Sequence, residues 1–291
     1  MSEKPINYYV PSQSIWPTLG ALGLLFTVIG AGMSVQQLGS NSSSGGWILT
    51  LGFIVILVMM FGWFNDVIDE SQANLYSEQM DRSFRQSMTW FIISEVMFFA
   101  AFFGALFYVR NIAIPWLGGA SNNAMTNLVL WPNFEAIWPL TTTPDGVKTQ
   151  AMPWHGLPLI NTIILLTSSV TLHFSHIALE KKNRGQLTIF LAITLVLGIS
   201  FIMFQGQEYV EAYQHMGLTL SAGVYGNTFF LLTGFHGLHV TIGSIMLAVM
   251  LFRVIKGHFT PENHFAFQAT SWYWHFVDVV WLGLFFFVYI I

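Results

Sequence analysis

One stretch decides the fold class of this chain: Trp90-Phe-Ile-Ile-Ser-Glu-Val-Met-Phe-Phe99. It lies in the middle of an apolar segment long enough to cross a membrane, and it holds one carboxylic acid, Glu95. An ionised carboxylate in hydrocarbon is costly and must be paired, hydrated or neutralised. Glu95 therefore has two interpretations: a proton-relay or ion-coupling acid, or a protonated carboxyl that is hydrogen-bonded to a neighbouring helix, to Ser94 or to Ser87.

The composition indicates an integral membrane protein. Of 291 residues, 54% are hydrophobic and only 8% are charged, whereas soluble domains average roughly 25% charged residues. The net charge is −4 and no basic run is present, so we do not expect nucleic acid as a partner. Because the chain has no cysteine, it has no disulfide, thiolate nucleophile or Cys-ligated metal.

Seven apolar segments reach the length of about 20 residues that a transmembrane helix needs. The expected helices span residues 15–35, 47–64, 85–109, 157–178, 186–204, 225–253 and 269–291, and the expected external loop spans residues 111–156. We expect a single all-α membrane domain over residues 1–291. Small residues in the first helix, Gly20, Gly23, Gly30 and Gly32, allow close packing of a helix or a lipid tail.

Basic residues predict the orientation, because Lys and Arg accumulate in cytoplasmic loops. With a cytoplasmic N-terminus the inner side holds eight of them and the outer side two. The inner residues are Lys4, Arg82, Arg85, Lys181, Lys182, Arg184, Arg253 and Lys256, and the outer ones are Arg110 and Lys148. Seven helices then place the C-terminus outside.

Acidic residues cluster between the second and third expected helices. They are Asp66, Asp69, Glu70, Glu78 and Asp81. A solvated loop is the simplest explanation, although acids at a membrane surface also gather protons or repel anionic lipid.

Histidine pairs were the candidates for a metal or haem site. His236 and His239 are three residues apart and share one helix face, as do His173 and His176. Two axial haem ligands must approach from opposite sides of the ring, and zinc or copper would need further ligands nearby. We therefore expect no metal and no catalytic residue in this chain, and favour histidines hydrogen-bonded between helices.

The last expected helix contains the only other carboxylate that lies clearly inside a span, Asp278. His275 precedes it by three residues, so the two side chains can pair and keep a buried acid satisfied. We interpret them as a structural pair.

Several motifs follow one another along almost the whole chain. They are Tyr9-Val-Pro11, Trp16-Pro17, Phe91-Ile-Ile-Ser-Glu-Val-Met-Phe-Phe99, Pro158-Leu-Ile-Asn-Thr162, Gln205-Gly-Gln-Glu-Tyr209, Tyr225-Gly-Asn-Thr-Phe-Phe230, Thr233-Gly-Phe-His-Gly-Leu-His-Val240 and Trp272-Tyr-Trp-His-Phe-Val-Asp-Val-Val-Trp281. In this combination the sequence resembles subunit III of the haem–copper cytochrome c oxidases.

The resemblance implies seven helices in bundles of two and five, separated by a lipid-filled cleft. It implies that haem and copper are held by the partner subunits I and II, and that this chain has no cofactor besides bound phospholipid. Glu95 matches the buried glutamate of the family. The implied lipid-binding residues are Trp63, Glu70, Arg253, Lys256, His258 and Thr260. The chain departs from the family pattern at Asn65, Ala222 and Gln268, so some head-group contacts are expected to differ.

The expected function is that of a non-redox accessory subunit of a proton-pumping cytochrome c oxidase. It would sustain proton uptake and turnover stability of subunit I in a bacterial inner membrane. One alternative is subunit III of a quinol oxidase of the same superfamily, which usually has fewer helices. The other is a standalone proton-coupled transporter that uses Glu95, which would need polar groups on several helices.

Overall fold

The computed structural model describes residue 9, residues 13–38 and residues 44–291. The α-helices are α1 (Trp16–Gln36), α2 (Ser44–Gln72), α3 (Glu78–Tyr108), the short α4 (Ile114–Leu117), α5 (Leu157–Glu180), α6 (Arg184–His215), α7 (Val224–Ile255) and α8 (Phe265–Leu284). Three short π-helical segments are η1 (Val109–Ala113), η2 (Thr126–Leu130) and η3 (Phe285–Ile290) in the part of the chain that the structure describes. Within these described ranges, seven helical segments are long and apolar enough to cross a membrane, which confirms the predicted all-helical membrane fold.

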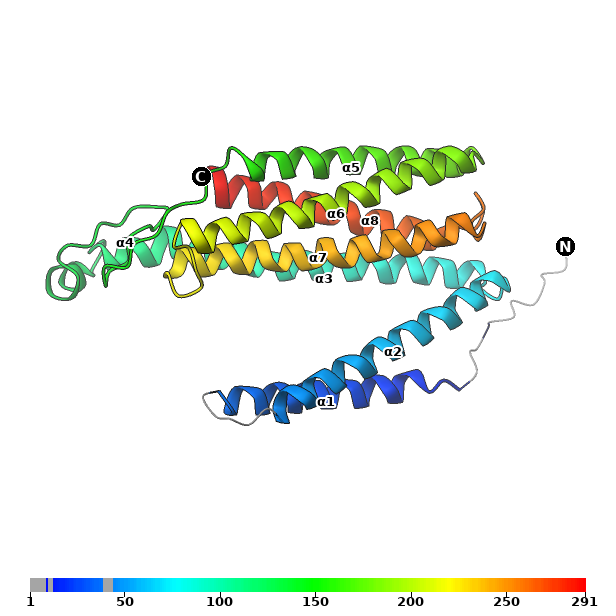
Figure 1. The fold of residues 1–291 in the computed structure, drawn as a ribbon, viewed down its shortest axis with the longest axis horizontal. Coiled ribbons are helices and arrows are strands. Elements are labelled where there is room, and N and C mark those ends of the chain that lie inside the picture. The colour runs from blue at the N-terminus through cyan, green and yellow to red at the C-terminus, as the bar shows by residue number, and fades with distance from the viewer. Residues whose placement is uncertain (1–8, 10–12, 39–43) are drawn as a thin grey trace. The chain divides into compact units, whose positions relative to one another are not determined.

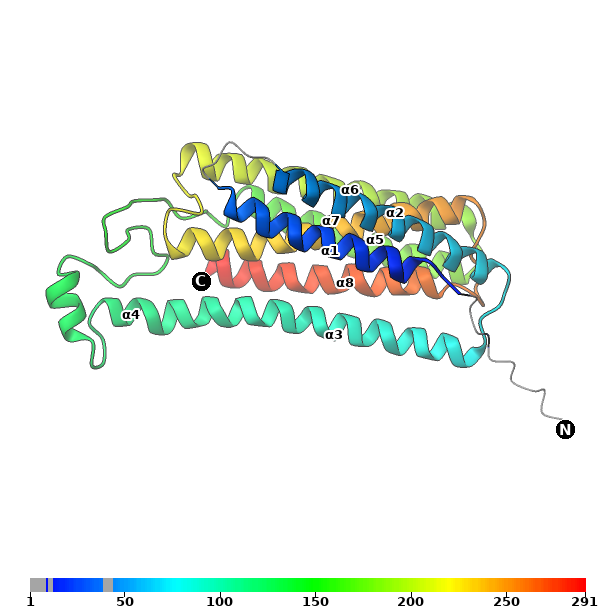
Figure 2. The ribbon, with the colours of Figure 1, turned by 90° about the horizontal axis from the view of Figure 1, so that it is seen from below.

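The chain divides into two units, Met1–Phe84 and Arg85–Ile291. We call them the two-helix unit, which contains α1 and α2, and the five-helix unit, in which α3, α5, α6, α7 and α8 run alongside one another (Figures 1 and 2). In the five-helix unit α6 packs against α5 and α7, and α8 packs against α5 and α7.

Glycines bring α1 and α2 together in the two-helix unit. A methyl group added to Gly30 would lie 2.2 Å from the backbone nitrogen of Leu49, and one added to Gly52 would lie 2.5 Å from that of Thr27. Small residues allow this close approach of backbones, which gives van der Waals contact where lipid removes the hydrophobic driving force. Gly30 therefore has the packing role predicted for it, whereas Gly32 faces open space.

Tryptophans occupy the centre of the five-helix unit. Trp274 and Trp281 of α8 are fully buried, and their indole N–H groups donate to Ser168 Oγ and Thr162 Oγ1 of α5, both at 2.9 Å. Gly198 of α6 makes room for the Trp274 ring, since a methyl group there would lie 2.6 Å from it. Each indole thus combines a large contact area with a satisfied polar group.

Several helices are longer than their apolar segments. α2 continues from the expected end at residue 64 to Gln72, so Asp66, Asp69 and Glu70 lie on its last turns and not in a loop. α6 continues from residue 204 to His215. Polar side chains of these ends, such as Asp66 and Glu208, bind protein partners. Hydropathy alone does not detect such helical turns.

The expected external loop 111–156 is partly helical, because α3 continues through η1 and α4 to Leu117. Its later part is anchored on the five-helix unit. The backbone N–H of Gln150 donates to the carbonyl of Met216 at 3.0 Å, and that of Met152 donates to the hydroxyl of Tyr225 at 3.2 Å. The end of this segment therefore covers the neighbouring ends of α6 and α7.

Candidate functional site

Glu95 is bonded to a histidine of a neighbouring helix. Its Oε2 lies 3.0 Å from Nε2 of His239 on α7, and Ser94, one of the two expected serine partners, donates instead to the carbonyl of Phe91 at 2.6 Å. Rings of Phe99 and Tyr273 lie 5.0 and 6.3 Å from the imidazole. The Glu95 side chain is 22% exposed and that of His239 10%, so the expected buried carboxyl is part of a partly exposed polar pair flanked by aromatic rings.

The second nitrogen of His239 defines how this pair holds a proton. His239 Nδ1 lies 2.6 Å from the carbonyl oxygen of Phe235, and a carbonyl oxygen only accepts, so Nδ1 carries a hydrogen. A neutral His239 therefore accepts at Nε2 from a protonated Glu95, whereas a charged His239 donates to an ionised Glu95. In both states one proton is shared between the two side chains.

His236, three residues earlier, points to other partners. It is fully buried, and its Nε2 donates to the carbonyl of Val277 on α8 at 3.2 Å. The rings of Phe201 and Trp281 lie 5.5 and 5.1 Å away. In the part of the chain that the structure describes, no group of three or more His, Cys, Asp or Glu side chains is placed to hold a metal ion.

His275 and Asp278 lie close together, with Nδ1 and Oδ2 separated by 3.6 Å. Asp278 is 4% exposed. Ser169 of α5 lies nearer to the imidazole, with its Oγ 2.8 Å from His275 Nδ1. The expected pair is therefore part of a three-residue arrangement that links α8 to α5.

Glu208 is a buried acid that sequence reasoning missed, because its position lies beyond the apolar segment of α6. Its side chain is completely buried, and its Oε1 accepts from the hydroxyl of Tyr289 at 2.6 Å. The signal in the sequence is spacing: Phe201, Gln205, Glu208 and Ala212 recur every three or four residues, and all four are buried. This spacing marks the inward face of a helix.

The residues expected to bind lipid lie in both units. In the two-helix unit Trp63 is 49% exposed, and Glu70 accepts from the hydroxyls of Tyr9 at 3.1 Å and Tyr76 at 2.8 Å. Burial, and then the Glu70 carboxylate, raise the pKa of Tyr76 above its ordinary value. Asn65, one of the departures, donates to Asp69 Oδ2 at 3.1 Å.

In the five-helix unit, Arg253 is only 5% exposed, and its guanidinium lies 4.5 Å from the ring centre of Phe259. Lys256 is exposed at the end of α7, with its ammonium 4.3 Å from the ring centre of Phe252. Gln268, another departure, accepts from Arg85 of α3. Arg253 is thus a buried cation, and Lys256 is the accessible one.

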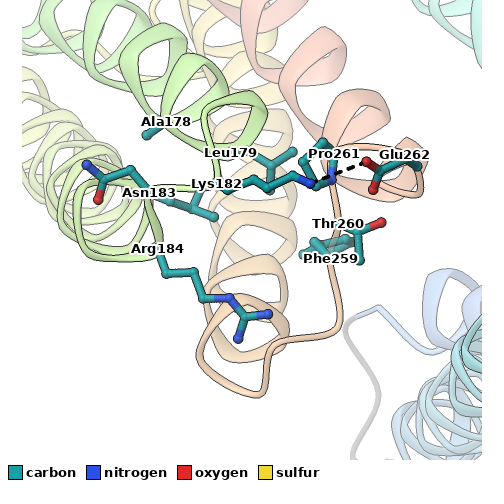
Figure 3. A pocket seen from close by; sticks show the side chains of 10 residues that line it. Ala178, Leu179, Lys182, Asn183, Arg184, Phe259, Thr260, Pro261 and Glu262 are labelled. Carbon is teal, nitrogen blue, oxygen red and sulfur yellow. Dashed lines mark ion pairs between the residues drawn. The ribbon is translucent and has the colours of Figure 1, made fainter.

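Thr260 lines a surface cavity of about 240 Å³ between the α5–α6 turn and the α7–α8 loop (Figure 3). Its polar side chains include Lys182, Arg184 and Glu262, and Lys182 Nζ lies 3.7 Å from Glu262 Oε1. The backbone N–H of Glu262, and then the Thr260 hydroxyl, lower the pKa of the Glu262 carboxyl. The apolar part of the lining includes Leu179, Leu187 and Phe259.

Comparisons with known proteins agree with the resemblance seen in the motifs. Residues 6–291 match the model of the family described as "Cytochrome c oxidase subunit III". Cytochrome c oxidase subunit 3 of Marchantia polymorpha is 40% identical over 283 residues, which cover 97% of this chain and 95% of that one. The proteins of the same name from Formosania lacustris and Ovis aries are each 39% identical, and the alignments cover 99% of this chain and 98% of theirs. The chain therefore belongs to the cytochrome c oxidase subunit III family.

Proposed function

We propose that this chain is a non-redox accessory subunit of a proton-pumping cytochrome c oxidase. The observation that carries the proposal is the family match along residues 6–291. The complex would reduce oxygen to water with haem and copper held in subunits I and II. The buried histidines support this division of labour, because His236 and His239 are bonded to protein atoms of other helices.

The proposed role is to sustain proton uptake and to prolong turnover of subunit I. Proton supply to a buried site depends on the surface potential at its entrance. Asp66, Asp69 and Glu70 on the last turns of α2, with Glu78 and Asp81 at the start of α3, would make that potential more negative. Removing the chain and its lipids also removes packing from the flank of its neighbour.

The experiment compares the intact complex with one from which this chain has been gently removed. Initial oxygen reduction should be nearly unchanged, whereas proton uptake at higher pH and the number of turnovers before inactivation should fall. Adding the chain back should restore both. Equal turnover numbers and equal pH profiles with and without the chain would contradict the proposal.

Glu95, paired with His239, is proposed as the proton-holding carboxyl of this subunit. A hydrophobic carbodiimide reacts with protonated carboxyls, so peptide mapping should find its label at Glu95 and lose it in Glu95→Gln. The amide preserves the shape of the side chain, and the variant complex should assemble. Labelling mainly at exposed acids such as Glu78 would contradict this assignment.

Phospholipid is the proposed ligand of the exposed polar residues at the ends of α2 and α7. Lys256 and the cavity beside Thr260 would receive a phosphate, and Trp63 and Glu70 would meet a second lipid, since a carboxylate retains acceptor capacity after two hydrogen bonds. The phosphate would gain charge-assisted hydrogen bonds from the ammonium group of Lys256. Arg253 is expected to act mainly in packing because it is buried.

Phospholipid per purified complex tests this assignment. Lys256→Ala should lower the amount of retained lipid, whereas Lys148→Ala, which removes an exposed lysine from the loop 118–156, should leave it unchanged. Equal lipid content in both variants and the unaltered protein would contradict the site.

The proposed orientation has a cytoplasmic N-terminus and a periplasmic C-terminus in a bacterial inner membrane, on the evidence of the eight-to-two bias of basic residues. The chain has no cysteine, so single cysteines report on accessibility without interference from this subunit. A membrane-impermeant maleimide added to intact cells should label Lys148→Cys and not Lys182→Cys. The reverse pattern would overturn the orientation.

A further inference from the structure

Four buried polar side chains lie on the first turns of α5, on the second half of α6 and on η3. Asn161 and Glu208 are fully buried, Gln205 is 5% exposed and Tyr289 is 7% exposed. α5 packs against both α6 and η3, and Figure 1 shows the C-terminal end of the chain beside the start of α5. These groups belong to no part of the function proposed above.

Trp281 of α8 contacts each of the helical segments that carry these side chains. Its indole binds Thr162, the residue after Asn161, and its ring lies 6.0 Å from that of Tyr289. The same indole lies 4.8 Å from the ring of Phe201, one turn before Gln205. The rings of Phe201, Trp281 and Tyr289 thus form an aromatic cluster beside the segments that carry the polar groups.

The hydrogen bonds within this layer are incomplete. The Tyr289 hydroxyl donates to Glu208 Oε1 at 2.6 Å. Within the described residues, Glu208 Oε2 and both amide atoms of Asn161 have no protein partner at hydrogen-bond distance. The Gln205 amide lies beside the Tyr289 hydroxyl but makes no hydrogen bond of good geometry. Buried polar atoms almost always have a partner, either protein or ordered water, so these atoms require an explanation.

The environment favours a protonated Glu208. An isolated carboxylate is costly to bury without a cation, and the charged group closest along α6, Glu211, is a second acid. Since Oε1 already accepts from Tyr289, the proton belongs on Oε2. That O–H then needs an acceptor, and the amide oxygens of Gln205 and Asn161 need donors.

We propose that Glu208, Gln205, Asn161 and Tyr289 form a binding site for internal water, and that Glu208 holds a proton there. A water molecule there can accept from Glu208 Oε2–H and donate to an amide oxygen, and buried water typically makes about three hydrogen bonds. The ligand class is water and not a metal ion, because the site offers one acid and two amides. The site lies in the core of the subunit and does not rest on the proposed lipid or turnover roles.

Infrared spectroscopy of the intact complex tests whether the Glu208 carboxyl is protonated. The spectrum of the unaltered protein minus that of Glu208→Gln should contain a protonated-carboxyl C=O band that shifts in D₂O. The matched control Glu211→Gln, which alters an exposed acid on the same helix, should instead remove a carboxylate band. Loss of a carboxylate band in Glu208→Gln would overturn the proposal.

A high-resolution map of the complex tests whether a water molecule is bound at this site. Density should appear within hydrogen-bond distance of Glu208 Oε2 and of the Gln205 amide, and direct side-chain pairing without such density would refute the site. If Glu208→Gln fails to assemble, Tyr289→Phe keeps the carboxyl and removes one donor. It should raise the frequency of the same C=O band, and an unchanged band would contradict the arrangement.

Discussion

The two-helix unit and the five-helix unit pack their helices with residues of opposite size, glycine in the first and tryptophan in the second. In the two-helix unit glycines such as Gly30 and Gly52 allow backbone to meet backbone. In the five-helix unit Trp274 and Trp281 fill the centre, and glycines such as Gly198 only make room for a ring. Close approach of backbones requires no polar chemistry, whereas a buried indole requires an acceptor on the next helix.

The two units also differ in where their acidic side chains lie. The polar contacts of Glu70 and Asp66 lie at the end of α2, where Tyr9, Tyr76 and Trp16 reach them. The five-helix unit instead buries Glu208 and Asp278 within its helices. A bundle of five helices has enough facing side chains to enclose acidic groups, and a pair of helices does not.

Removing an indole from the five-helix unit should have the largest effect. Trp274→Ala leaves a cavity beside Gly198 and Gly243, and deletions of this size cost about 3–5 kcal/mol in protein cores. The temperature at which half of this chain is lost from the purified complex should fall clearly. Trp272→Ala, two residues earlier and partly exposed, should have a much smaller effect. Equal losses would show that the buried indoles do not dominate this unit.

A glycine substitution should perturb the two-helix unit to an intermediate extent. Gly30→Ala places a methyl group 2.2 Å from the Leu49 nitrogen, and such overpacking costs about 1–3 kcal/mol. Amide hydrogen exchange in α1 and α2 should accelerate. Gly32→Ala meets nothing within 4 Å and should slow exchange or leave it unchanged, since alanine favours helix. Identical exchange in the two variants would contradict glycine-based packing.

The smallest effect is expected at the tyrosine contacts of Glu70. Tyr76→Phe removes a 2.8 Å hydrogen bond, and because the site is partly exposed we expect about 0.5–1.5 kcal/mol. Burial and Glu70 raise the pKa of Tyr76, so the neutral phenol is the stabilising form. The contribution should be constant below the ordinary phenol pKa of about 10 and disappear as the pH rises through the raised value.

Amide exchange over residues 66–76, measured at neutral pH and above pH 10, checks this pH dependence. Tyr213→Phe, at an exposed tyrosine of α6, serves as the control. A penalty that grows with pH would mean that the phenolate, and not the phenol, is the form bound in the folded protein.

The sequence predicted the seven spans because each is a long apolar segment, and it predicted His275 beside Asp278 because their contact is local. It did not predict the partner of Glu95, since His239 lies 144 residues away and spacing carries no information on such contacts. Helix ends were underestimated for a related reason. The polar turns of α2 and α6 are stabilised by distant partners, Tyr289 for Glu208 and Trp16 for Asp66.

We propose that the buried histidines of the five-helix unit bind protein atoms and hold no redox centre. The most direct test is the haem and copper content of both fractions after gentle removal of this chain from the complex. We expect all haem and copper to stay with subunits I and II and the released chain to carry neither. Haem absorbance or copper released together with this chain would contradict it, and would identify His236, His239 or His275 as a ligand.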